Sequence, residues 1–118
     1  MAEKIKLKHP IQIDGKAVKE LSYNFDELTA NDLMRAYDRA HASEEITVVA
    51  VVEMDVKYQL SCTVSAVLKA NPDYDPADIY RARGVDVMAL TRLGRNFLQS
   101  GAEDGQGEES EKLSPPSA

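Results

Sequence analysis

Apolar and polar residues alternate along the opening segment, Lys4–Ile13. One side carries Ile5, Leu7, His9, Ile11 and Ile13, and the other carries Lys4, Lys6, Lys8, Pro10 and Gln12. This period of two is typical of a β-strand with one buried face. Pro10 is expected at a sheet edge or a bulge, because it cannot donate a ladder hydrogen bond. With the turn dipeptide Asp14-Gly15 and a second alternating run to Phe25, the pattern predicts a β-hairpin over residues 4–25.

The register of this hairpin depends on the length of its turn. A two-residue turn would place Leu7 opposite Ser22. A three-residue turn would instead place Leu7 opposite Tyr23, and Ile5 opposite Phe25. The second register joins apolar side chains across the strands, so we favour a three-residue turn or a bulge. Because an isolated hairpin is marginally stable, its apolar face should lie on helices or on a second copy.

Beyond the hairpin, apolar residues recur every three or four positions, as on one face of a helix. They predict four helices, at about residues 30–42, 46–70, 76–83 and 86–99. Thr29 and Asp32 form a capping-box pattern before the first, and Asp75-Pro76 is typical of the start of the third. Gly94 lies on the apolar side of the last helix, where it permits close approach of a neighbour. The pattern predicts an α+β fold, with an N-terminal hairpin packed on a mainly α-helical body in one domain, residues 1–101.

The segment Ile46–Ala70 is the longest run of the body without Pro or Gly. Its first seven residues, 46–52, are almost entirely apolar and rich in β-branched residues, so a strand competes with a helix there. We favour one continuous helix, because a single apolar face continues through the whole segment: Val49, Val52, Val56, Leu60, Thr63 and Val67. The apolar run ends at Glu53, far short of the roughly 20 residues that span a bilayer, so membrane insertion is not expected.

Charge is distributed unevenly along the chain. The formal net charge is −6, which argues against nucleic acid as the main partner. Residues 103–118 hold five acids and one lysine, or −4, which leaves −2 for the rest. The small, acidic tail over residues 102–118 is predicted to be disordered. The single Cys62 excludes an internal disulfide, and no signal-peptide core is present, so a cytoplasmic location is expected.

Residue types used in catalysis occur without a pattern that indicates a site. His9 belongs to the apolar face of the first strand, and His41 falls near a helix C-terminus, where a cation is favourable. Cys62 has apolar neighbours and no flanking cation, so it is expected to be a small buried hydrophobe. Asp73, Asp75 and Asp78 lack the glycine and the final Glu of an EF-hand loop. We therefore predict no catalytic, cofactor-binding or metal-binding residue, and no enzymatic activity.

Three segments together resemble the phage tail assembly chaperones, the small tail assembly proteins of Mu-like and other contractile-tailed phages. The first is the opening hairpin, with its PI…DGK.V.EL pattern between Pro10 and Leu21. The second is the helix opening from Leu28 to Leu33. The third is an ordered set near the C-terminus: Val67-Leu68, Pro76–Ile79, Asp86, Leu90 and Phe97-Leu98. The likeness covers residues 4–98, and residues 46–52 depart from it by being more apolar than the family pattern.

The resemblance implies a non-enzymatic protein that binds the tape measure protein and keeps it soluble in the host cytoplasm. It further implies recruitment of tail tube protein and absence from the mature virion. A homo-oligomer without cofactors is expected. The partner-binding surface is predicted opposite the core face of the long helix, on Val48, Val51, Met54 and Tyr58. Two alternatives stay open: Val51, Met54 and Tyr58 pack under the hairpin, or the protein is a small homo-oligomeric cytosolic adaptor, unrelated to phages, with the long helix as its dimer seam.

Overall fold

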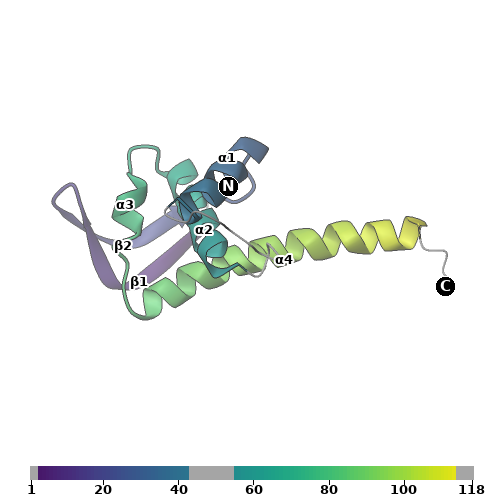
Figure 1. Cartoon of the computed structure of the whole chain (residues 1–118). Helices are drawn as coiled ribbons and strands as arrows, with labels where there is room; N and C mark the ends of the chain where they lie inside the picture. The colour runs from purple at the N-terminus through teal and green to yellow at the C-terminus, as the bar shows by residue number, and fades with distance from the viewer. Residues whose placement is uncertain (1–2, 43–54, 114–118) are drawn as a thin grey trace.

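In the computed structural model, the described part of the chain, residues 3–42 and 55–113, forms a hairpin and four helices (Figure 1). For residues 101–113 only the backbone is described. The elements follow one another as β1 Glu3–Ile13, β2 Lys16–Tyr23, α1 Ala30–Ala40, α2 Val56–Ala70, α3 Pro76–Ile79 and α4 Val85–Leu113. The predicted α+β class, with an N-terminal hairpin on a helical body, is confirmed.

The hairpin has two registers separated by an irregularity. Near the turn, Ile13 pairs with Lys16, so the turn contains two residues, Asp14 and Gly15, both with positive φ. Toward the open end, Ile5 pairs with Leu21. The predicted three-residue turn is therefore wrong, and so are the pairings of Leu7 with Tyr23 and Ile5 with Phe25. The predicted alternative of a bulge is confirmed, because the register shifts between Lys6 and Ile11.

This bulge preserves the apolar face that the alternation predicts. The pairs near the turn join an odd with an even position. Those beyond the bulge join two odd or two even positions, so Ile5 meets the fully buried Leu21. The backbone amides of Lys8 and His9, inside the bulge, donate to the two carboxylate oxygens of Asp86 at 2.8 and 2.7 Å. Asp86 lies in the first turn of α4 and is only 2% exposed. The Asp86 carboxylate thus supplies the hydrogen-bond acceptors that the amides of Lys8 and His9 do not find on β2.

The helix α2 lies at the centre of the molecule and packs against α1, α4, β2 and α3. Most of its residues between Tyr58 and Val67 are buried, which includes several small polar side chains. Ser61 Oγ donates to the carbonyl of Ala36 in α1, and Thr63 Oγ1 donates to the carbonyl of Leu90 in α4. These bonds satisfy the hydroxyl groups that would otherwise oppose burial.

The helices α2 and α4 approach each other closely at Gly94, as the sequence predicts. A Cβ atom built on Gly94 would lie 1.8 Å from the carbonyl oxygen of Gln59. Because Gly94 faces Gln59 while Leu90 faces Thr63, the two helices run antiparallel. The buried residues of the hairpin pack on these helices, and the largest fully buried side chains include Leu21, Ile79, Leu90, Val64 and Val67.

The start of α2 differs from the prediction of one helix over residues 46–70. Asp55 has an extended backbone (φ −78°, ψ 108°) and caps α2, accepting from the amides of Lys57 and Tyr58. Helical backbone is therefore interrupted at Asp55, and residues 46–54 lie outside the described part. Val56, predicted on the core face, is 62% exposed. The three-and-four spacing did not mark this boundary, because a helix cap depends on one polar residue rather than on periodicity.

The two C-terminal helices also end elsewhere than predicted. The helix α3 stops at Ile79 rather than at residue 83, and the chain then turns to Gly84, which has φ +63°. The helix α4 continues past Gln99 and Gly101 to Leu113 and projects from the body as a long arm (Figure 1). The disorder expected for residues 102–118 stays a prediction, since only backbone, and only to Leu113, is described there.

Candidate functional site

Of the four residues predicted to bind a partner, only Tyr58 lies in the described part; Val48, Val51 and Met54 lie outside it. Tyr58 is 8% exposed and belongs to a small cluster with Ala36 and Cys62. Its ring meets the edge of Tyr37 at a centroid distance of 5.4 Å. Tyr58 therefore packs against α1, in a cluster that Phe25, at the end of the predicted hairpin, also contacts.

An open pocket of about 300 Å³ lies beside Tyr58, where α1 and α2 meet. We call it the apolar pocket; its lining consists of Leu33, Met34, Tyr37, Asp38 and Tyr58. Met34 is 65% exposed, which is high for a large apolar side chain on a small protein. The single carboxylate of the lining, that of Asp38, is exposed. The pocket thus offers an apolar floor with a negative charge beside it.

The polar atoms at the base of this pocket are held in their neutral form. Burial, followed by the neighbouring Cys62 thiol, raises the pKa of Tyr58 to about 12. Burial likewise raises the pKa of Cys62 to about 11, although Tyr58 and Arg39 oppose the shift. The thiol is fully buried and protonated at neutral pH, as the sequence predicts for a small hydrophobe. Neither group is an activated nucleophile.

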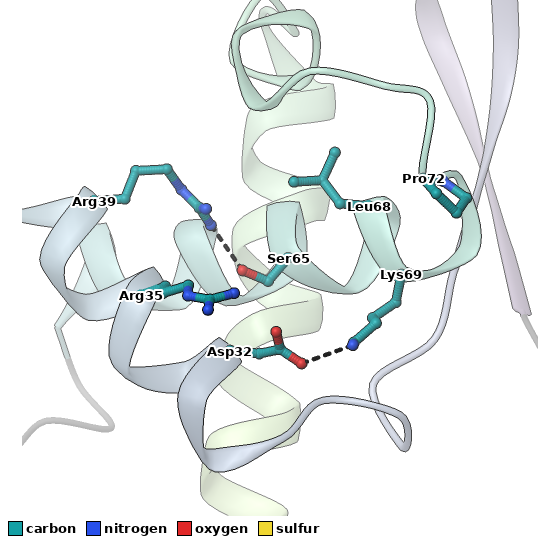
Figure 2. Close-up of a pocket in the computed structure, with 7 residues that line it drawn as sticks. All are labelled: Asp32, Arg35, Arg39, Ser65, Leu68, Lys69 and Pro72. Atoms are coloured by element: carbon teal, nitrogen blue, oxygen red, sulfur yellow. Dashed lines mark hydrogen bonds and ion pairs between the residues drawn. The ribbon is translucent and has the colours of Figure 1, made fainter.

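A second pocket, of about 500 Å³, opens on the other side of α1, between α1 and the C-terminal half of α2 (Figure 2). We call it the cationic pocket; its lining consists of Asp32, Arg35, Arg39, Ser65, Leu68, Lys69 and Pro72. The α1 residues are spaced by three and four, so they share one side of that helix. The capping box formed by Thr29 and Asp32, which the sequence predicts, sets where α1 begins and hence where this side faces.

Arg39 is fixed in the cationic pocket by neutral acceptors. One terminal nitrogen of its guanidinium donates to the Ser61 carbonyl at 2.7 Å and to Ser65 Oγ at 2.8 Å. Its Nε lies 3.4 Å from the hydroxyl of Tyr80. These bonds join α1, α2 and the end of α3, and they leave the positive charge without a carboxylate partner within the described residues.

The other charges of this pocket are arranged differently. Lys69 pairs with Asp32 at 3.0 Å, as Figure 2 shows, so these two charges offset each other. Hydrogen bonds from Thr29, first of all from its backbone, and then the pairing with Lys69 lower the pKa of Asp32. Arg35 lies between Arg39 and Asp32 in Figure 2, is exposed, and takes part in none of the ion pairs among the described residues. Chemically, the pocket is suited to an anion.

The remaining polar residues considered from sequence have structural roles. His41 is the C-cap of α1, and its Nε2 lies 2.5 Å from Asp55 Oδ2, which links the end of α1 to the start of α2. The ring of His9 lies against Gly84. Asp75 caps α3, as predicted, and forms a capping box with Asp78 that was not predicted from the sequence. Among the side chains that the structure describes, no three His, Cys, Asp or Glu residues gather in a group suited to a metal ion.

Sequence reasoning missed the cationic pocket. Its signal is a pair of arginines four residues apart in α1, with Ser65 in α2. The arginines define one side of a helix, but only the packing of α1 on α2 brings them to Ser65 and to the backbone carbonyl of Ser61. A separate finding concerns membranes: within the described residues, no helix is both long enough and apolar enough to cross one.

Compared with protein-family models, with curated proteins and with solved structures, the chain matches none of them.

Proposed function

We propose that this protein is a phage tail assembly chaperone, which binds the tape measure protein and keeps it soluble during tail morphogenesis. It acts in the host cytoplasm, has no enzymatic activity, and recruits tail tube subunits. The likeness of residues 4–98 to the tail assembly proteins suggests the role. The observation that carries the proposal is the apolar pocket with the exposed Met34 beside it.

The apolar pocket fits the recognition of a partner helix. An amphipathic helix lays its apolar face in a groove and anchors it with a few side chains. Met34 is unbranched and flexible, so it adapts to different apolar partners, which suits binding at many points along one long helical protein. The Asp38 carboxylate favours partner segments that carry Lys or Arg next to their apolar face. Tyr58 contributes to the floor of the pocket rather than to an exposed surface.

The alternative of an adaptor with the long helix as dimer seam receives less support. In the described part of that helix, residues from Tyr58 to Val67 are mostly buried within the protomer itself. They leave little surface for a second copy. A tape measure partner that docks on α1, beside the helix rather than along it, is compatible with this burial.

The proposal is tested by co-expression with a candidate tape measure protein, sought as a long coiled-coil-rich reading frame directly downstream of this one. We expect the partner to be insoluble alone and to be recovered in a soluble complex of fixed stoichiometry with the full chain. The substitution Met34→Glu should abolish the complex, because it places a charge at the apolar pocket. Met88→Glu is the matched control, since Met88 is 63% exposed on α4, away from this pocket. A partner that is soluble alone and does not bind, or equal losses with both variants, would refute the proposal.

A further inference from the structure

The cationic pocket carries two guanidinium groups that no carboxylate neutralises within the described residues. Arg39 is bonded only to a carbonyl and to two hydroxyl groups, and Arg35 belongs to none of the ion pairs there. The remaining cation, Lys69, is already paired with Asp32. The pocket therefore has a local charge of about +2 in a chain whose net charge is −6. Such a site attracts an anion.

The geometry favours a carboxylate on a peptide. Arg39 is held in place before any ligand arrives, so less conformational entropy is lost when an anion binds. A guanidinium presents a planar fork of donors that matches a carboxylate. The rest of the lining, Leu68 and Pro72, is apolar and forms a wall against which the stem of an acidic side chain can pack. Ser65 Oγ, which accepts from the Arg39 guanidinium, also lines this pocket.

This chain carries a segment with the complementary charge. Its residues 103–118 hold five acids and one lysine, a net charge of −4. Residues 103–113 of this segment belong to the end of α4, which runs away from the cationic pocket of the same copy. Leu98 packs near Ala36 and Cys62, so α4 leaves the body beside the N-terminal half of α2, whereas the pocket lies on the C-terminal half. Figure 1 shows the arm continuing outward from there, away from the body.

We propose that the cationic pocket binds the acidic tail, residues 103–118, of a second copy of this chain. The contact pairs tail carboxylates with Arg35 and with the free edge of the Arg39 guanidinium. Because pocket and tail are different surfaces, two copies can exchange tails reciprocally, or further copies can add head to tail. This inference does not depend on the proposed function, since it concerns α1, the C-terminal half of α2 and the tail, and not the apolar pocket.

The test is sedimentation velocity of the full chain over a range of concentrations and salt. The wild-type chain should self-associate at an ionic strength of about 0.01 M, where the Debye length is about 30 Å, and dissociate at about 1 M, where it is about 3 Å. Arg35→Glu should weaken association by about tenfold, because an attractive charge becomes a repulsive one. Neutralising the five tail acids to Gln or Asn should have a similar effect. Arg35 is exposed, so neither change should disturb folding, which circular dichroism would verify.

Two controls separate this contact from general charge effects. Arg95→Glu makes the same charge change on an exposed position of α4, and should alter association by less than about twofold. Combining Arg35→Glu with the neutralised tail should weaken association little further than either change alone, because both changes remove the same contact. A monomer at all concentrations in low salt would overturn the proposal. So would equal effects of Arg35→Glu and Arg95→Glu, or an association that survives neutralisation of the tail.

Discussion

The substitution Asp86→Asn tests how far the fold depends on a carboxylate at the bulge of β1. In the native protein, both carboxylate oxygens accept a backbone N–H, from Lys8 at 2.8 Å and from His9 at 2.7 Å. Asparagine keeps one acceptor and replaces the other by an NH₂ group, which cannot accept. One backbone amide would then face a donor in a site that is only 2% exposed.

The expected loss follows from these two bonds. A hydrogen bond to a charged group contributes about 1.5–3 kcal/mol, and a buried donor left without a partner costs about 1–3 kcal/mol. One bond becomes neutral and weaker, and the other is lost. We therefore expect Asp86→Asn to lower the free energy of unfolding by about 2–4 kcal/mol. Urea denaturation at pH 7 measures this quantity.

The pH dependence gives an independent check. Burial of Asp86 opposes its ionisation, but the amides of Lys8 and His9 and the charges of these residues outweigh it, and the pKa is lowered. A lowered pKa means that the folded state favours the ionised form. Its stabilising contribution is present above the unfolded pKa of about 3.9 and is lost as the pH falls through the lower folded pKa. The difference between wild type and variant should therefore shrink in acid.

The control for this experiment is Asp73→Asn, because Asp73 is exposed and takes part in none of the hydrogen bonds or ion pairs found among the described residues. It should change the unfolding free energy by less than about 0.5 kcal/mol. A loss below about 0.5 kcal/mol for Asp86→Asn, or a difference from wild type that is the same at pH 2 and pH 7, would refute the role given to this carboxylate.

Three further outcomes are expected. Gly94→Ala should destabilise the protein by about 3 kcal/mol or more in urea denaturation, since its Cβ would overlap the Gln59 carbonyl; a change under about 1 kcal/mol would contradict the close packing of α2 and α4. Cys62 should be unreactive to a thiol reagent at pH 8 in the native state and react fully in denaturant, because it is buried and its pKa is raised to about 11; rapid native labelling would disprove its burial. Residues 102–113 of α4 should exchange their amide hydrogens faster than residues 85–100 of the same helix, because three glycines between residues 101 and 107 each weaken a helix by about 1 kcal/mol; equal protection along the whole of α4 would contradict this reasoning.

The faces of the hairpin could be predicted because alternation is a local property. Leu7, Ile11 and Ile13 are buried, and the lysines opposite them are exposed, as the pattern indicates. The register could not be predicted in the same way. It depends on Asp86, which lies 78 positions after Lys8 and appears in the sequence only as one more acid at the start of a helix. A long-range contact of this kind leaves no periodic signal.

The same limit explains why the candidate site could be predicted only in part. The capping box at Thr29 and the N-cap at Asp75 follow local rules and were predicted correctly. The start of α2 was missed, because apolar spacing continues across Asp55 while the backbone does not remain helical there. In the sequence, Arg35 and Arg39 are indistinguishable from the ordinary polar positions of an amphipathic helix. They form a pocket because α2 places Ser65 Oγ and the Ser61 backbone carbonyl against Arg39.

The bond between the first strand and the last helix also has a consequence for synthesis in the cell. A ribosome adds about 5–20 residues per second, so roughly 4–16 s separate the addition of Lys8 from that of Asp86, 78 positions later. During that interval the bulge has no acceptors for two of its amides, and the hairpin has no α4 to cover it. The opening strand of the nascent chain therefore stays incomplete until the first turn of α4 has been synthesised, and arrested chains that end before Asp86 should remain open to protease at the hairpin. Until α4 has been synthesised, the exposed Lys4, Lys6 and Lys8 of that strand would disfavour its pairing with other nascent chains.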